Sequence, residues 1–122
     1  MNRLIRLAVV AAYLLAGSRG FAADAAHGKQ LYESRCFACH SVDANRIGPA
    51  HKGVFGRKAG SVSGFDYSPA LKASEIVWNA DTLERWLADP EQLISGQKMG
   101  YSVPNHADRA DLIAYLEQVS GK

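Results

Sequence analysis

An all-α fold with long loops is predicted for this chain by three features of its sequence. Four segments have the start of a helix, because each begins with a side chain suited to cap a helix N-terminus. Each of them continues with apolar residues at helical spacing or with a proline at the first helical position. No segment of useful length alternates polar and apolar residues as a strand would. The connecting stretches are long, and the first is rich in glycine. We therefore expect separate helices joined by irregular segments, with no internal repeat.

The first 23 residues have the layout of a secretory signal. Arg3 and Arg6 precede an apolar run over 7–16, and small residues follow at 20–23. The run is about half of the roughly 20 residues that a membrane-spanning helix needs, so we expect cleavage rather than anchoring. This divides the chain into a signal peptide, 1–23, and one domain, 24–122, exported to the periplasm. The cut can follow any of three alanines, Ala22, Ala23 or Ala25.

Charge and cysteine count exclude several classes of protein. The full chain of 122 residues has a formal charge of +2, but the signal carries three arginines and no acid. The mature chain then has 11 basic and 12 acidic side chains, which gives a charge of about −1. A nucleic-acid binder with a strongly basic face is excluded. The two cysteines stand too close together for a disulfide scaffold.

The first helix of the domain is predicted over 25–35. Gly28, Leu31, Tyr32 and Arg35 fall on one stripe at helical spacing. Asp24 stands where a side chain can cap the helix N-terminus.

Three further helices follow from their start signals. Ser68 and Pro69 predict a short helix over 69–73. The segment 81–84 resembles a capping box and begins a helix that must stop before Pro90; its apolar face contains Leu83, Trp86 and Leu87. Asn105 can cap a last helix with Asp108 in its first turn; the apolar face of that helix consists of Leu112, Tyr115, Leu116 and Val119.

Two irregular stretches, 41–65 and 91–104, are unusually long for so small a domain. They and the residues around them are too apolar for disorder, since they include Phe55, Phe65, Tyr67, Trp78, Leu93, Ile94 and Tyr101. We expect these loops to enclose something apolar.

The segment 36–40 reads Cys-Phe-Ala-Cys-His, a pattern suited to covalent attachment of haem c. Each thiol can add to one vinyl group of the porphyrin, while the His40 imidazole reaches the iron. A thioredoxin-like redox pair belongs in a fold with a sheet, and none is predicted here. A zinc site would need further ligands, and His27, His51 and His106 match no zinc spacing.

The mature chain has a single methionine, Met99, between Lys98 and Gly100 in the second irregular stretch. Methionine is often a core filler, but a loop position suits that role poorly. Because His and Met form a known axial pair, we expect Met99 to be the sixth iron ligand. His51 and His106 are the alternatives.

The order of these features resembles a class I cytochrome c, closest to the mitochondrial type and its bacterial c2-like relatives. The resemblance covers essentially all of 24–122. It rests on the Cys-Phe-Ala-Cys-His segment and on the motifs that follow it in the same order, at 48–49, 54–58, 65–67, 76–78, 82–83, 98–99 and 109–116.

The resemblance implies one haem c bound through Cys36 and Cys39, with His40 and Met99 as axial ligands. It implies that the Pro49 carbonyl accepts a hydrogen bond from the His40 ring. It also implies that a haem propionate is bound by three side chains, Arg57, Tyr67 and Trp78. Gly28 and Tyr32 match the face of the first helix that crosses the last helix near Leu112 and Tyr115.

Several positions depart from the family pattern. Trp86 stands where a tyrosine is usual, and Gln97 stands where a threonine commonly bonds the methionine region. Leu71 stands in place of an asparagine, and Tyr101 in place of a phenylalanine. Of the family's ring of lysines around the haem edge, Arg35 and Lys98 are the clearest remnants, so docking through a strong basic patch is not expected.

With both axial positions filled by protein, the iron has no open site for a substrate. We therefore expect a monomeric one-electron carrier, with no catalytic residue, that acts transiently between respiratory or dehydrogenase partners in the periplasm. Two alternatives are a peroxidase or gas sensor in which Met99 binds weakly, and a dedicated subunit of one oxidoreductase.

Overall fold

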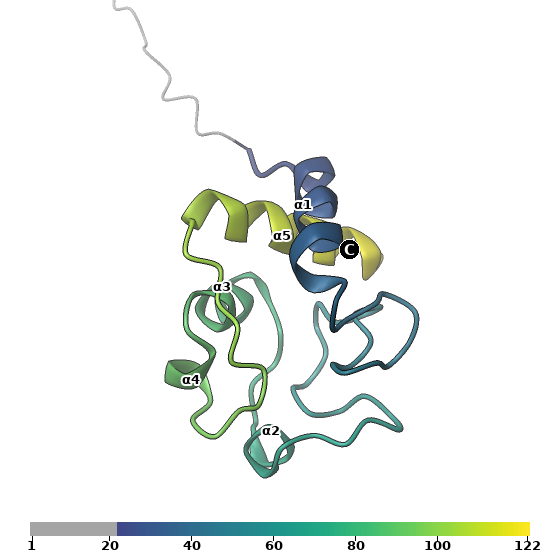
Figure 1. Ribbon diagram of the computed structural model, residues 1–122, viewed down its shortest axis with the longest axis vertical. Helices are drawn as coiled ribbons and strands as arrows, with labels where there is room; N and C mark the ends of the chain where they lie inside the picture. The colour runs from purple at the N-terminus through teal and green to yellow at the C-terminus, as the bar shows by residue number, and fades with distance from the viewer. Residues whose placement is uncertain (1–21) are drawn as a thin grey trace, which may run out of the picture.

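The computed structural model describes residues 22–122, in which helices alternate with long loops (Figure 1). No strand occurs among these residues, and the sole β-type contact is an isolated bridge between Lys58 and Val77. The all-α prediction is confirmed for this part of the chain. The expected signal lies outside the described residues except for Ala22 and Ala23. The elements in chain order are α1 (Ala25–Leu31), the π-helical turn η1 (Tyr32–Cys36), α2 (Pro69–Ala73), α3 (Ala80–Ala88), α4 (Pro90–Leu93) and α5 (His106–Val119).

The first helix begins where predicted but changes its winding before it ends. The Asp24 carboxylate accepts hydrogen bonds from the backbone N–H groups of Ala26 and His27, at 3.0 and 3.1 Å. The predicted helix over 25–35 is confirmed, but it is α-helical only to Leu31 and continues as a π-helix over Tyr32–Cys36. The Phe37 N–H then bonds the Tyr32 carbonyl at 3.0 Å, five residues back, which widens the last turn into a π-helix.

Helices α1 and α5 cross in close contact at one end of the molecule (Figure 1). A Cβ atom on Gly28 would lie 1.9 Å from the backbone oxygen of Asp111 in α5, so only glycine permits this approach. The Tyr32 and Tyr115 rings meet at the same crossing, with their centroids 5.3 Å apart. The expected packing of the first helix on the last is therefore present.

Capping side chains set the starts of the middle helices. The Ser68 hydroxyl accepts from the Leu71 N–H at 3.2 Å, and α2 has the predicted bounds. The predicted start of α3 at 81–84 is wrong, because Asn79 and Thr82 form the capping box instead. The Asn79 side chain accepts from the Thr82 N–H and the Thr82 hydroxyl from the Asn79 N–H, both at 2.9 Å. As predicted, α3 ends before Pro90.

The second irregular stretch contains a short helix that was not predicted. Asp89 accepts from the Gln92 N–H at 3.1 Å, and Pro90 occupies the first position of α4. The Asp89-Pro90 pair repeats the start signal of Ser68-Pro69, so the signal was present in the sequence.

The last helix has its predicted cap, since the Asn105 side chain accepts from the Asp108 N–H at 3.0 Å. Arg109 of α5 donates to Glu84 of α3 at 2.6 Å and joins the two helices. Leu112 of α5 and Val103 of the preceding loop are the most completely buried large side chains of the described chain. The loop over 41–65 has no helix or strand, as expected, and with 94–104 it forms much of the lower half of the view in Figure 1.

Candidate functional site

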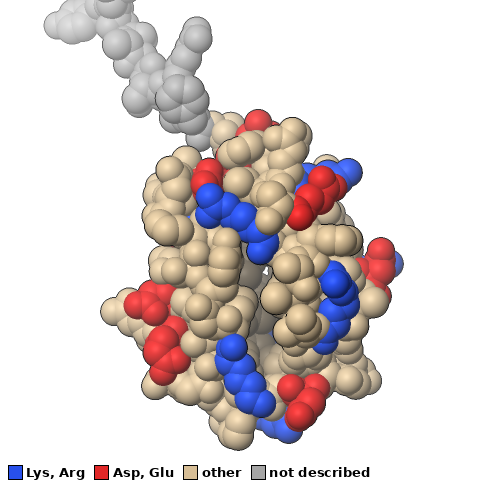
Figure 2. Space-filling view, viewed as in Figure 1, with Lys and Arg blue, Asp and Glu red and all other residues tan. Residues whose placement is uncertain are grey.

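A cavity of about 560 Å³ opens between the two long loops and is lined also by residues of η1, α3 and α5. On the face shown in Figure 2 the molecule is hollowed between its two halves. Basic side chains border the hollow at separate places, and acidic side chains lie mostly further out. All residues that the sequence assigned to the site line this one cavity: Cys36, Cys39, His40, Pro49, Arg57, Tyr67, Trp78 and Met99.

The two cysteines lie on a tight turn at one end of the cavity. Cys36 closes η1, and its carbonyl accepts from the backbone N–H groups of Cys39 and His40 at 3.1 and 2.8 Å. Both thiols are free. Burial raises the pKa of the Cys36 thiol to about 11, whereas a redox-active CxxC pair has a lowered thiol pKa. The turn therefore presents the Cys36 thiol in its neutral form and does not resemble a dithiol redox centre.

His40 is held in one orientation. Its ring Nδ1 lies 2.9 Å from the Pro49 carbonyl oxygen, which is the contact expected from the sequence. The ring also packs on Gly48, where a Cβ atom would lie 2.1 Å from the His40 Cε1. Burial lowers the pKa of His40, so the imidazole is neutral. With Nδ1 as the donor to Pro49, the Nε2 lone pair is free to bind a metal.

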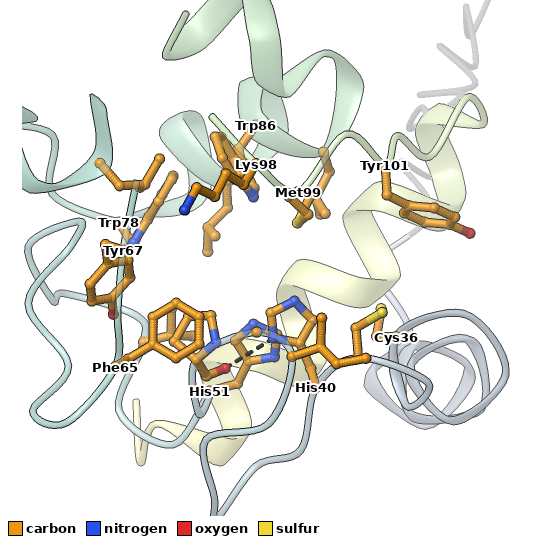
Figure 3. Close-up of a pocket in the computed structure, with 18 of the residues that line it drawn as sticks. Cys36, His40, His51, Phe65, Tyr67, Trp78, Trp86, Lys98, Met99 and Tyr101 are labelled. Atoms are coloured by element: carbon orange, nitrogen blue, oxygen red, sulfur yellow. Dashed lines mark hydrogen bonds between the residues drawn. The ribbon is translucent and has the colours of Figure 1, made fainter. Parts of the chain in front are cut away.

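Met99 lies on the wall of the cavity that faces His40 (Figure 3). Its loop is shaped by polar contacts next to it. The Gln97 side-chain oxygen accepts from the Gly100 N–H at 2.8 Å, and the Gln97 amide donates to Glu91 at 3.0 Å. These bonds hold the backbone directly after Met99 to the Gln97 side chain, which Glu91 holds in turn.

Glu91 is an organising residue that the sequence analysis missed. Its carboxylate also accepts from the Gly96 N–H at 2.9 Å and from the Ser95 hydroxyl at 3.0 Å. These hydrogen bonds, the Gly96 one foremost, lower the pKa of Glu91. A carboxylate placed just before a Ser-Gly-Gln loop was the available signal.

Tyr67 and Trp78 lie opposite Cys36 across the cavity (Figure 3). Arg57 also lines the cavity and is next to Trp78, since its backbone carbonyl accepts from the Trp78 N–H at 2.8 Å. The Tyr67 hydroxyl accepts from the Val62 N–H at 3.0 Å. The Arg57 Nη atoms donate to the carbonyls of Lys52 and Ala50, at 3.1 and 3.0 Å.

The Arg57 Nε is a buried donor with no hydrogen-bond partner in the protein, the sole such side-chain atom found in residues 22–122. An unpaired buried donor of this kind calls for an acceptor. A propionate carboxylate would meet that need, and the attachment thiols lie at the other end of the same apolar cavity. The residues present therefore fit haem c.

Neither His51 nor His106, the two alternatives for the sixth ligand, lies on the wall of the cavity that contains Met99. The His51 ring stacks on the His40 ring, with centroids 4.1 Å apart and an interplanar angle of 20°, so it shares the His40 side (Figure 3). His106 is exposed at the start of α5, where its Nδ1 lies 3.3 Å from Glu84, and it does not line the cavity.

The opening of the cavity carries few unpaired charges. Lys98 lines it, while Arg35 lies 3.6 Å from Asp108 of α5. Two exposed apolar side chains, Ile47 and Tyr101, line the same opening.

Residues 22–122 contain neither a candidate membrane span nor a side-chain cluster suited to a metal ion. No helix in that part of the chain combines the length and apolar character needed to cross a membrane. No group of three or more His, Cys, Asp or Glu side chains in it is placed to hold a metal ion.

Comparison with known proteins gives concordant matches. The family model described as cytochrome c matches residues 25–120. Cytochrome c 2.1 of Caenorhabditis elegans is 47% identical over 104 residues, covering 83% of this chain and 94% of that protein. Cytochrome c of Arabidopsis thaliana is 43% identical over 99 residues, covering 78% and 88%. The solved structure of cytochrome cH from Methylobacterium extorquens has 40% identity and a TM-score of 0.74, covering 78% of this chain and 98% of that chain.

Proposed function

The chain belongs to the cytochrome c family, and from that membership we propose that His40 and Met99 are the axial ligands of its haem in an exported one-electron carrier. It binds one covalent haem c through Cys36 and Cys39, and it is an electron-transfer protein that acts with redox partners, not an enzyme. The observation that carries the proposal is the placement of His40 and Met99 on facing walls of one cavity (Figure 3).

The chemistry that haem c supplies when bound is the exchange of one electron at its iron. The Pro49 carbonyl holds the His40 Nδ1–H, so the proximal ring has one tautomer and one orientation. The loop bonds of Gln97 and Glu91 hold Met99 in place. His40 and Met99 would together hold the iron from both sides and would leave no coordination site for a substrate.

The apolar walls of the cavity exclude water from most of the group. Leu83 and Leu112 are buried, as is Trp78, and all of them line it. A dry surrounding disfavours the additional positive charge of the ferric state, and a thioether ligand acts in the same direction. Both effects raise the midpoint potential, which suits a carrier that accepts electrons from respiratory or dehydrogenase partners.

Export is supported by residues 1–23, which have the order of a secretory signal. The mature protein would then work in the periplasm as a monomer that meets its donor and acceptor in transient contacts. Scattered charge at the cavity opening (Figure 2) supports short encounters that do not depend on one strong basic patch.

Replacement of Met99 tests the axial pair. We expect Met99→Ala to open the sixth position, lower the midpoint potential, abolish the methionine-to-iron charge-transfer band of the ferric protein and raise peroxidase turnover. Lys98→Ala is the matched control, since it changes the neighbouring exposed residue of the same loop and should leave the band intact. A ferric spectrum unchanged by Met99→Ala would show that another group is the ligand.

A further inference from the structure

His51 makes a specific contact that iron ligation does not explain. It follows Pro49 by two positions and lines the cavity on the His40 side. The two imidazole rings lie almost parallel, 20° apart, with centroids separated by 4.1 Å (Figure 3). This is a face contact on the residue that we propose as proximal ligand, and it complements the edge contact that Pro49 makes through Nδ1.

The His51 ring is itself fixed from behind. Its Nδ1 lies 2.9 Å from the hydroxyl oxygen of Tyr32, a buried residue of η1. The His51 backbone N–H donates to the Ser41 carbonyl at 3.1 Å. Because the ring is held through its backbone and through Nδ1, it forms a rigid surface for the His40 ring.

A row of aromatic rings connects this surface to the helix crossing. The His51 and Tyr32 centroids are 5.5 Å apart, and those of Tyr32 and Tyr115 are 5.3 Å apart. Tyr115 belongs to α5, whose packing against α1 is fixed by Gly28. The orientation of the His51 ring is therefore tied to the most closely packed helix pair of the fold.

We propose that His51 is a positioning residue that sets the plane of the His40 imidazole, with Tyr32 as its anchor. The inference rests on the proposed role of His40 as an iron ligand. The plane of an axial imidazole affects the splitting of the iron d orbitals, and therefore the spread of g values in the electron paramagnetic resonance spectrum of the ferric form. A polar neutral ring beside the ligand also stabilises the ferric charge better than an aliphatic side chain would.

The test compares three variants of the haem-loaded protein at one fixed pH. His51→Leu removes the ring, and we expect a changed spread of g values and a raised midpoint potential. His51→Phe keeps a ring for stacking and should restore the spread of g values toward that of the unchanged protein. His106→Leu makes the same substitution at an exposed histidine outside the cavity and should change neither quantity.

A further variant, Tyr32→Phe, deletes only the hydroxyl that anchors the His51 ring. It tests the proposal even if His51→Leu fails to yield haem-loaded protein. We expect it to shift the g values in the same direction by a smaller amount. This inference alone would be overturned if the unchanged protein has a low-spin ferric spectrum and His51→Leu leaves the g values unaltered. Where His51→Leu yields no loaded protein, unaltered g values in Tyr32→Phe would overturn it in the same way. A high-spin ferric spectrum of the unchanged protein would overturn the axial pair and this inference together.

Discussion

At the scale of single residues, Arg57 has a buried hydrogen-bond donor for which the described part of the protein supplies no acceptor. Two of its guanidinium nitrogens are bound by backbone carbonyls, which fixes the plane of the fork. The third, Nε, is buried without a partner. Burial also lowers the pKa of Arg57, although the group stays charged at any ordinary pH. A fixed cation with a free donor suits a carboxylate.

Substitution of Arg57 should lower the midpoint potential of the haem, because a nearby cation favours the less positive ferrous state. We expect a clear decrease for Arg57→Leu and a smaller one for Arg57→Lys, which keeps the charge but loses the fork. The loss of a charge-assisted hydrogen bond should also cost about 1.5–3 kcal/mol of stability. Redox titration together with denaturant unfolding measures both effects. Equal potentials in Arg57→Leu and the unchanged protein would contradict the propionate assignment.

The residues that line the cavity were predictable where a residue type carries its own chemistry, while their roles as haem ligands stay predictions. Cysteines 36 and 39, His40 and Met99 were found because thiol, imidazole and thioether groups suit haem attachment and ligation, and the structure brings all of them to one cavity. The contacts of His51 and Glu91 were not foreseen. The stacking of the His51 ring depends on three-dimensional placement and leaves no spacing pattern in the sequence, whereas the position of Glu91 before the Ser-Gly-Gln loop was a signal that was not used.

At the scale of elements, the capping residues predicted where helices start, whereas the apolar pattern did not predict how a helix is wound inside. Asp24, Ser68 and Asn105 cap the helices for which they were proposed. The start of α3 was misplaced because several adjacent residues, Asn79 among them, can act as caps, and the choice depends on which reciprocal pair closes. The π-helical turn η1 could not be predicted, because a change from α to π winding alters hydrogen-bond partners and leaves the apolar stripe in place.

The crossing of α1 and α5 is stabilised by polar contacts of Asp111 with Asp24 and His27, which we call the polar clip, as well as by Gly28. The Asp111 carboxylate accepts from the Asp24 backbone N–H and lies against the His27 Nδ1, both at 2.7 Å. The bond to Asp111 raises the pKa of His27, and the bonds from Asp24 and His27 lower the pKa of Asp111. Both partners are charged between the ordinary aspartate value of 3.8 and the ordinary histidine value of 6.5.

This clip predicts a pH-dependent contribution to stability. The share from His27 is complete below pH 6.5 and is lost as pH rises through its raised pKa in the folded state. The share from Asp111 is complete above pH 3.8 and is lost as pH falls through its lowered pKa. His27→Ala should therefore destabilise the protein most near about pH 5, with a smaller effect near about pH 9.

Denaturant unfolding of His27→Ala at the two pH values measures this difference. Lys29→Ala, which removes a different exposed cation of the same helix, serves as control and should show no such pH dependence. A destabilisation by His27→Ala that is the same at both pH values would show that the clip does not act as a charged pair.

At the scale of the whole molecule, the loops are ordered around the space that the haem fills. A domain of about 100 residues buries a limited apolar core by itself. Here buried residues such as Tyr67, Leu71 and Trp78 line the cavity and pack against one another around it. The haem is therefore part of the core, and the cysteines attach it covalently.

Removal of both thiols should consequently affect folding as well as cofactor retention. We expect the double variant Cys36→Ala, Cys39→Ala to release its haem on acid-acetone extraction and to lose much of its helical circular dichroism. Cys36→Ala alone keeps one thioether bond and should remain folded. A stable, helical and haem-free double variant would contradict the structural role of the cofactor.

The fold class and the membership of the cavity were predictable because the motifs occur in a fixed order along the whole chain. The character of the molecular surface was less accessible to sequence reasoning. The mature charge near −1 predicted no strong basic patch, but the pairing of Arg35 with Asp108 and the apolar side chains at the cavity opening emerge only from the packed chain.

A spectroelectrochemical titration of the haem-loaded protein tests the central claim most directly, because it follows the axial ligands and the electron stoichiometry together. We predict one reversible one-electron transition, in which the ferric form is low-spin and keeps the methionine-to-iron charge-transfer band. A high-spin ferric form that lacks this band, or one that turns over peroxide readily without any substitution, would contradict the assignment of His40 and Met99 as a saturated pair in an electron carrier.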